Sequence, residues 1–251
     1  MSSAALEVQD LTLHIGGAKI VEGISFAVAP GETLGVIGPN GAGKTTLFNL
    51  ISGIRPPTRG RILLDGTDVS DWTAHRRARV GLGRTFQTSS IFPLLTVHEN
   101  VRLAAEADLG GSMRIWRRPE KFSPALNRAV ESLHAVGLHE RAGAIAGSLS
   151  HGDKRRLEIA IVLASNAKTV LLDEPMAGMA TENVGPLTDL IRKLAKEHGK
   201  TVLMVEHHMH VVLGVADRVA VLHHGQLLAC DTPDNVMANS TVQSAYLGEP
   251  L

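Results

Sequence analysis

The stretch GPNGAGKTT at residues 38–46 constrains the fold of this 251-residue chain more than any other feature. It fits the pattern G-x-x-x-x-G-K-[ST], in which glycines let backbone N–H groups point at a β-phosphate, the lysine reaches the β- and γ-phosphates, and the hydroxyl can hold Mg²⁺. The stretch lies between an expected strand and an expected helix, which distinguishes it from a chance glycine-rich turn. We therefore expect a nucleotide to be bound by Gly38, Pro39, Asn40, Gly41, Ala42, Gly43, Lys44, Thr45 and Thr46.

The rest of the chain has an ordered α/β pattern. Alternating or continuous apolar runs predict strands at residues 6–15, 21–29, 32–37, 169–174 and 201–206. Helical spacing predicts a helical lobe from Thr96 to about Leu138, interrupted by a basic loop at residues 113–122. It also predicts a helix at residues 182–198 between two buried parallel strands, and two short helices after residue 231.

Two consecutive carboxylates end one of these apolar strands, in the run LLDEP. Asp173 at the strand end can orient the shell of a Mg²⁺ ion, and Glu174 beside it can polarise a water for in-line attack on a γ-phosphate. An acidic pair that merely ends a strand is the structural alternative. An apolar strand has few packing reasons to stop in D-E-P, so we favour the catalytic interpretation.

A histidine follows the next strand, in the run VEHHMH. His207 could donate a hydrogen bond to the γ-phosphate or to the attacking water. The alternatives are an exposed histidine, or a metal cluster formed with His208, His210, His223 and His224. Adjacent histidines on a strand point to opposite faces and no cysteine or carboxylate spacing completes a shell, which disfavours a metal cluster.

The composition excludes several classes of protein. Lys plus Arg equals Asp plus Glu at 25 each, so no overall basic field indicates a nucleic-acid partner. The single Cys230 cannot form an internal disulfide, and the N-terminal residues lack the pattern of a secretory signal, so we expect the cytoplasm as the compartment. No window of 18 apolar residues is free of charges or helix breakers, so we expect no membrane span in this chain.

Five motifs, in this order and spacing, resemble the nucleotide-binding domain of an ABC transporter: GPNGAGKTT, GRTFQ, LSHGDKRRLEIA, LLDEP and EHHM. The flanking runs GRTFQTSSIFPLLTVHENV, DEPMAGM, VADRVAVLHHGQLLACDTPDNV and AYLGE are similar to an ATP-binding subunit of the branched-chain amino-acid importer type. The resemblance covers nearly the whole chain.

The resemblance implies an α/β fold with a P-loop NTPase, RecA-like core, an antiparallel β subdomain and a helical subdomain. We expect a single domain over residues 1–251. The core and the antiparallel subdomain would comprise residues 1–86 and 155–230, the helical subdomain residues 87–154, and a C-terminal helical tail residues 231–251. ATP and Mg²⁺ are the implied ligands, with Thr45, Gln87 and Asp173 around the metal.

The resemblance also assigns the turn that precedes the helix of LSHGDKRRLEIA. In this family two domains lie head to tail, so Ser150 and Gly152 would contact the γ-phosphate of ATP bound to the partner. A hydroxyl, a close backbone N–H and a helix N-terminus suit that task, although a plain N-cap is the usual meaning of a serine before a helix. Gln87 matches the loop glutamine that contacts Mg²⁺ or water and connects the core to the helical subdomain, and we expect it to act beside Glu174 and His207.

The chain departs from the common family pattern at the signature turn and after LLDEP. His151 and Asp153 stand where Gly and Gln are commonest, a variant compatible with this importer subgroup. Ala180 occupies a position where many members have Asp, which leaves the communication between the two ATP sites open.

The third departure concerns the adenine base. The aromatic residue that often stacks on adenine maps to Ile15. Base stacking is worth about 1 to 3 kcal/mol, so this contribution would be missing or replaced by His14 or Val21. We expect Ile15 and Val21 at the base.

The implied function is ATP hydrolysis that powers an importer, with branched-chain or related amino acids as the expected solutes. The implied partners are a second ATPase subunit in a homo- or heterodimer, two permeases and, indirectly, an extracytoplasmic solute-binding protein. The chain would be peripheral on the cytoplasmic face of the inner membrane.

Four alternatives remain at this point. The first is import of urea or short amides. The second is lipopolysaccharide export, against which the GRTFQ and HGD runs argue. A third is an ABC ATPase of DNA repair or translation, disfavoured because the chain has one phosphate loop and no sustained heptads. The fourth is a nucleotide-binding module without turnover, disfavoured because Glu174 and His207 are both present.

Overall fold

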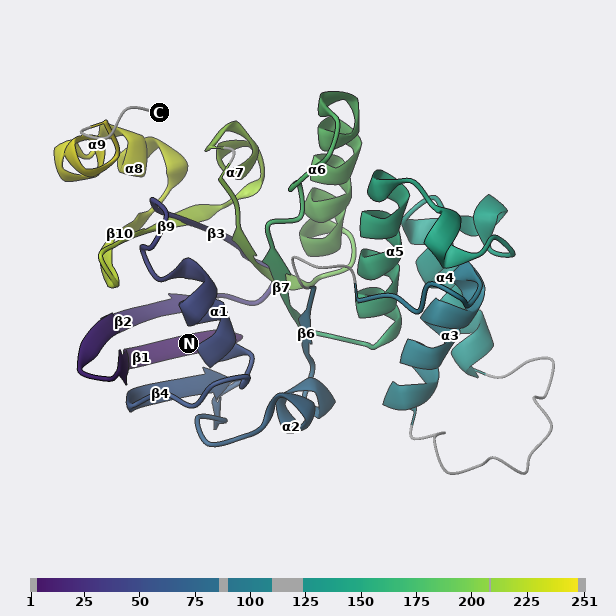
Figure 1. Ribbon diagram of the computed structural model, residues 1–251, viewed down its shortest axis with the longest axis horizontal. Helices are drawn as coiled ribbons and strands as arrows, with labels where there is room; N and C mark the ends of the chain where they lie inside the picture. The colour runs from purple at the N-terminus through teal and green to yellow at the C-terminus, as the bar shows by residue number, and fades with distance from the viewer. Residues whose placement is uncertain (1–3, 86–89, 110–123, 208, 248–251) are drawn as a thin grey trace.

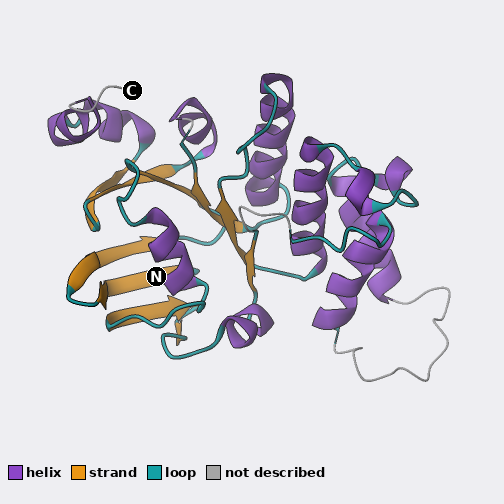
Figure 2. Ribbon diagram, viewed as in Figure 1, coloured by secondary structure: helices purple, strands orange, loops and turns teal. Residues whose placement is uncertain are grey.

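Two β-sheets and a group of helices organise the structure, a computed structural model that describes residues 4–85, 90–109, 124–207 and 209–247 (Figures 1 and 2). The strands are β1 (Leu6–Ile15), β2 (Ala18–Val28), β3 (Thr33–Ile37), β4 (Arg59–Leu64), β5 (Thr67–Asp68), β6 (Leu82–Arg84), β7 (Thr169–Asp173), β8 (Thr201–Val205), β9 (Arg218–His223) and β10 (Gln226–Asp231). The helices are α1 (Lys44–Ile51), α2 (Ala74–Arg79), α3 (Val97–Asp108), α4 (Pro124–Ala135), α5 (His151–Ala164), α6 (Thr181–Lys196), α7 (Met209–Val215), α8 (Pro233–Ala238) and α9 (Ser240–Leu247).

The larger sheet has the strand order β10-β9-β3-β8-β7-β6. Its strands from β9 to β6 are parallel, and β10 pairs with β9 antiparallel. The smaller sheet, β2-β1-β4-β5, is antiparallel throughout. The expected α/β class, with an antiparallel sheet and a separate helical lobe, is confirmed.

Each central strand divides its apolar side chains between two cores, because successive side chains point to opposite faces of a sheet. On β7, Val170 and Leu172 belong to the core on the helix side of the large sheet, whereas Leu171 belongs to the core shared with α1 and the antiparallel sheet. On β8, Met204 and Leu203 divide in the same way. The continuous apolar runs therefore reflect burial on both faces.

The helix α1 lies between the two sheets, and α6 and α7 lie on the opposite face of the large sheet (Figure 1). The group α3, α4 and α5 lies beyond the β6 edge. At the start of α3, the Thr96 hydroxyl accepts a hydrogen bond from Glu99 N at 3.1 Å, and the Glu99 carboxylate accepts one from Thr96 N at 2.8 Å. This reciprocal capping satisfies backbone donors that the helix itself leaves unpaired.

Several boundaries differ from the sequence prediction. The second strand begins at Ala18, because Ile15 pairs with Ala18 across the two-glycine turn. The expected lobe boundary at residue 154 falls inside α5, which is continuous from His151 to Ala164. Asp231 ends β10 before the two C-terminal helices begin. The basic loop at residues 113–122 lies outside the described residues.

None of the helices in the described part of the chain combines the length and the hydrophobicity that a bilayer span requires.

Candidate active site

The phosphate loop connects the end of β3 to the start of α1, between the two sheets. Two glycines are required there by geometry. A Cβ atom at Gly38 would lie 2.3 Å from the backbone oxygen of Leu222 on β9, so no larger residue fits. Gly43 caps α1 with a φ of 99°, a conformation that costs an L-residue free energy. The loop is therefore pressed against β9 and leads directly into the N-terminus of α1.

Lys44 is buried and binds the loop itself. Its ammonium group donates hydrogen bonds to the backbone oxygens of Gly38 at 2.6 Å and Pro39 at 3.0 Å. Burial lowers the pKa of this ammonium group, and the carboxylate of Glu174 acts in the opposite direction. A phosphate oxygen would replace the two carbonyl oxygens as the acceptor for Lys44.

A cavity of about 270 Å³ opens beside this loop. It is lined by Ile20, Asn40, Gly41, Ala42, Gly43, Lys44, Thr45, Thr46, Glu174 and His207. The structure thus brings the phosphate loop together with both side chains expected to act on a γ-phosphate. Ile20 was not among the expected residues, and its apolar side chain offers no sequence signal for a nucleotide site.

Glu174 and His207 are in direct contact. The Nε2 atom of His207 lies 2.9 Å from Oε1 of Glu174. Glu174 has a φ of 48°, a left-handed conformation that is uncommon for a residue with a side chain, and its N–H donates to Val205 O at 3.0 Å. This turn after β7 brings Glu174 toward the end of β8, where His207 follows.

Asp173 is held by an arginine that the sequence analysis did not single out. Nη2 of Arg84 donates to Oδ2 of Asp173 at 2.8 Å, and the two side chains are only 7% and 6% exposed. Nη1 of Arg84 also donates to Asn49 Oδ1 and Ser52 Oγ at the end of α1, at 2.9 and 2.7 Å. Arg84 therefore ties the strand end at β7 to the helix that follows the phosphate loop.

The oxygen atoms near this strand end suit Mg²⁺, which prefers carboxylate, hydroxyl and phosphate oxygens. Asp173 is a buried carboxylate at the end of β7, and Thr45 is an exposed hydroxyl in the cavity wall. Gln87, the third residue expected around the metal, lies outside the described residues.

Ser150 caps α5, and its Oγ accepts a hydrogen bond from Asp153 N at 3.1 Å. The hydroxyl is exposed, and Gly152 faces the start of α6, where a Cβ atom would approach Met179 and Asn183 at 3.5 to 3.7 Å. Of the described residues that line the phosphate-loop cavity, none belongs to α5. The structure therefore does not bring the signature turn into the cavity of its own chain.

The residues expected at the adenine base do not line the cavity either. Ile15 is 45% exposed at the end of β1, and Val21 is fully buried on β2. Val21 has no surface for a base to contact in this conformation. Its neighbour Ile20 lines the cavity in its place.

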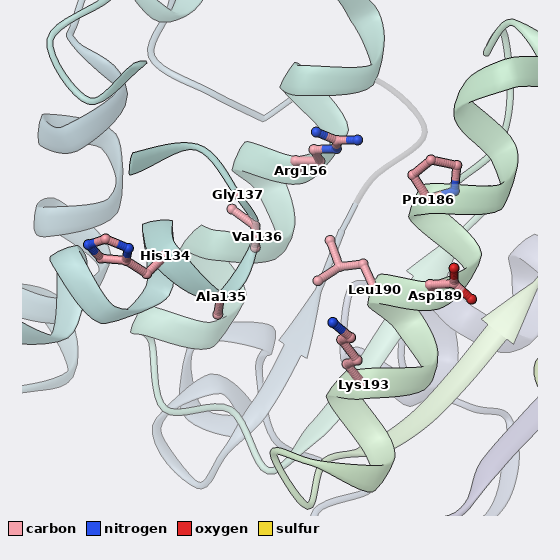
Figure 3. A pocket seen from close by; sticks show the side chains of 9 residues that line it. All are labelled: His134, Ala135, Val136, Gly137, Arg156, Pro186, Asp189, Leu190 and Lys193. Atoms are coloured by element: carbon pink, nitrogen blue, oxygen red, sulfur yellow. The ribbon is translucent and has the colours of Figure 1, made fainter. Parts of the chain in front are cut away.

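A second hollow, of about 310 Å³, lies between the helical lobe and α6 (Figure 3). Arg156 borders it from α5, and Pro186, Asp189, Leu190 and Lys193 border it from α6. None of the residues expected to bind or hydrolyse a nucleotide lines this hollow. Within the described ranges, no group of three or more His, Cys, Asp or Glu residues is placed to hold a metal ion.

Comparisons with known proteins identify the family. The family model described as ABC transporter matches residues 21–177. The chain is 39% identical over 256 residues to the high-affinity branched-chain amino acid transport ATP-binding protein BraF of Pseudomonas aeruginosa, with 99% of this chain and 100% of that protein covered. It is 37% identical over 246 residues to the lipopolysaccharide export system ATP-binding protein LptB of Escherichia coli, with 98% of each covered.

Solved structures of ATP-binding cassettes have the same fold. The ADP conformation of MJ1267, an ATP-binding cassette of an ABC transporter, superposes with a TM-score of 0.85 at 29% identity over 98% of this chain and 99% of that chain. The dimeric structure of MJ0796, a bacterial ABC transporter cassette, superposes with a TM-score of 0.77 at 26% identity over 91% of this chain and 98% of that chain.

Proposed function

The chain belongs to the ABC transporter family, and from that premise we propose that it is the ATP-hydrolysing subunit of an importer for branched-chain or related amino acids. The contact between Glu174 and His207 in the wall of the phosphate-loop cavity carries the hydrolytic part of this proposal. The similarity to BraF, whose name gives branched-chain amino acid transport, supports the solute class.

The phosphate loop, the Glu174–His207 pair and the expected metal ligands each have a proposed role. The backbone N–H groups of the phosphate loop and the ammonium group of Lys44 bind the β- and γ-phosphates, with Lys44 exchanging its carbonyl partners for phosphate oxygens. Glu174 accepts a hydrogen bond from the attacking water and orients it. His207 contacts the Glu174 carboxylate and faces the γ-phosphate. Thr45, Asp173 and Gln87 would hold Mg²⁺, whose charge offsets the negative charge on the phosphates.

A second ATPase subunit completes the site. Because Ser150 is exposed and α5 does not reach the cavity of its own chain, the signature turn is available to ATP bound on a partner. The hydroxyl of Ser150, the backbone at Gly152 and the N-terminus of α5 form a suitable contact for a γ-phosphate. The likeness to a cassette solved as a dimer supports this arrangement.

The remaining partners are two permeases, with a solute-binding protein outside the membrane. Phe92 and Leu94, which are 58% and 87% exposed, follow Gln87 in sequence and offer apolar surface that a permease could cover. With these partners, the chain would be peripheral on the cytoplasmic face of the inner membrane. Lipopolysaccharide export is the second candidate, favoured by the 37% identity to LptB.

Purification of the tagged chain from its source membrane, followed by mass spectrometry, tests the transporter assignment. We expect two permeases and a second ATPase to copurify. The complex in proteoliposomes should then take up leucine, isoleucine or valine when a binding protein and ATP are supplied, and Lys44→Ala should abolish uptake. Copurification with lipopolysaccharide-export components, or with DNA-repair or translation proteins, would contradict the importer assignment.

A further inference from the structure

Glu206 is a buried carboxylate that none of the roles above uses. It directly follows β8, precedes His207 and is 2% exposed. Its Oε1 atom accepts a hydrogen bond from Met176 N at 2.7 Å, and its Oε2 atom accepts one from His207 N at 3.2 Å. A buried charge is costly unless hydrogen bonds stabilise it, and these bonds go to the backbone of two different segments.

Those two segments carry the proposed catalytic pair. Met176 lies two residues after Glu174, in the turn that follows β7. That turn contacts the end of β8 through the bond from Glu174 N to Val205 O at 3.0 Å and through the bond from Met176 N to Glu206. The left-handed conformation of Glu174 is unfavourable for a residue with a side chain, so surrounding contacts must hold it in place.

We propose that Glu206 is the positioning residue for Glu174 and His207, because its carboxylate accepts hydrogen bonds from His207 N and from Met176 N in the turn that contains Glu174. With both bonds in place, the Glu174 carboxylate and the His207 imidazole are held 2.9 Å apart at the cavity wall. This inference rests on the proposed hydrolytic role of Glu174. In this role Glu206 contacts neither the nucleotide nor the attacking water, and it acts through Glu174 and His207.

The chemistry of the carboxylate makes the proposal testable by an isosteric change. A carboxylate accepts at both oxygens, whereas a glutamine amide accepts at one end and donates at the other. In Glu206→Gln, one of the two N–H groups therefore faces an NH₂ group in place of an acceptor. A displacement of about 1 Å in a reacting group can cost up to about 10²-fold in rate, so the effect on turnover should be measurable.

The decisive experiment is a double-mutant cycle with Glu206→Gln and Glu174→Gln in the full-length chain. We expect Glu206→Gln to lower kcat by about 10- to 100-fold while the affinity for a fluorescent ATP analogue stays within about twofold. In the Glu174→Gln background, the same change should cause a clearly smaller loss, because part of the effect of Glu206 passes through Glu174. Equal losses in both backgrounds, or an unchanged kcat, would overturn the proposal.

Two further variants keep the test decisive. Glu206→Asp retains the charge but is one methylene shorter, so it should fail to reach Met176 N and show the same dependence on Glu174. Glu158 is a buried glutamate at 5% exposure that pairs with Arg155 at 2.8 Å on α5, and Glu158→Gln serves as the matched control. We expect this control to lower the melting temperature and leave kcat within about twofold.

The cycle also separates this proposal from the proposed function. If the unmodified chain does not hydrolyse ATP, or if Glu174→Gln has no effect, the hydrolytic role itself is wrong. If Glu174→Gln abolishes turnover and both Glu206 variants retain it, only the positioning role is wrong.

Discussion

Glu174 combines an uncommon backbone conformation with a proposed catalytic role. Its carboxylate lies 2.9 Å from Nε2 of His207, and both line the cavity beside the phosphate loop. Replacing the carboxylate by an amide keeps the shape but removes most of its basicity. We expect Glu174→Gln to bind ATP normally and to lower kcat by about 10² to 10⁴, the usual contribution of a general base. Steady-state phosphate release and a nucleotide titration measure the two quantities, and unchanged turnover would remove Glu174 from the mechanism.

Arg77 is a buried charged residue that contacts the C-terminal end of α1, the helix that follows the phosphate loop. This arginine on α2 is fully buried, and its guanidinium group donates to the backbone oxygens of Leu50 and Ile51 at the end of α1, both at 2.7 Å. It also donates to the backbone oxygens of Ser70 and Trp72 at 2.8 and 3.0 Å. Burial lowers the pKa of Arg77 to about 10, so the group remains charged at neutral pH. Its positive charge interacts favourably with the negative C-terminal end of the α1 dipole.

The substitution Arg77→Met tests this role. Methionine fills much of the same space but leaves backbone oxygens without their donor, so the free energy of unfolding should fall by about 3 kcal/mol. Arg79→Met is the matched control, because Arg79 is exposed on the same helix and its removal should change the free energy by less than about 0.5 kcal/mol. Urea denaturation followed by circular dichroism measures both, and equal effects would contradict the role of Arg77.

Local sequence predicted the residues that we propose to act on the nucleotide, and it missed the buried residues that contact them. The phosphate loop, Asp173 and Glu174 are recognisable because their spacing along the chain carries the chemistry. Arg84 and Glu206 are not, because their partners lie 89 and 30 residues away in sequence. The sequence predicts the base contact at Ile15 and Val21, whereas the alternation of β2 brings Ile20 to the cavity and leaves Val21 buried.

At the scale of elements, the packing of α7 on β3 depends on one glycine. A Cβ atom at Gly35 would lie 2.3 Å from Cγ1 of Val212 on α7 and 3.3 Å from Cβ of Ala216. The helix α7 begins at Met209, two residues after His207, so its distance from β3 affects where the histidine lies. A β-branched side chain cannot move aside by a simple rotation, so a larger residue at position 35 must displace the helix.

The pair Gly35→Ala and Val212→Ala tests this contact. We expect Gly35→Ala alone to lower the free energy of unfolding by about 2 kcal/mol, the usual cost of overpacking. Because Val212→Ala removes the opposing methyl groups, the double variant should be more stable than the sum of the two single changes predicts, by about 1 kcal/mol. Chemical denaturation of the four proteins gives this coupling, and strict additivity would show that the helix adjusts without strain.

Element type was predictable where a segment is buried on both faces, and less so at the edges of the sheets. The runs that became β3, β7 and β8 are continuous and apolar, so their sequence alone indicates a strand. By contrast, β5 has two residues and β6 three, and their strand character comes from pairing with β4 and β7. Tertiary pairing of this kind leaves little signal in the local sequence.

At the scale of the whole molecule, the two proposed parts of an ATP site lie apart within one chain. The phosphate-loop cavity and the signature turn at Ser150 are separate, and no described residue of α5 lines that cavity. If the turn completes the site of a partner chain, ATP binds more tightly to the dimer than to the monomer. Binding of that kind shifts assembly toward the dimer by mass action.

Light scattering on a sizing column, with and without Mg²⁺ and ATP, tests this central claim most directly. The Glu174→Gln protein, which we expect to hydrolyse ATP slowly, should be monomeric alone and shift to a dimer with ATP. If the chain pairs with a different ATPase, the coexpressed pair is used. Adding Ser150→Arg should abolish the dimer and leave the ATP affinity of the monomer within about twofold, since the bulky side chain obstructs only the ATP of the partner. Adding Lys44→Ala should instead weaken ATP binding and dimerisation together. Loss of monomer ATP binding in the Ser150→Arg protein, with its circular dichroism spectrum unchanged, would contradict a site shared between two chains.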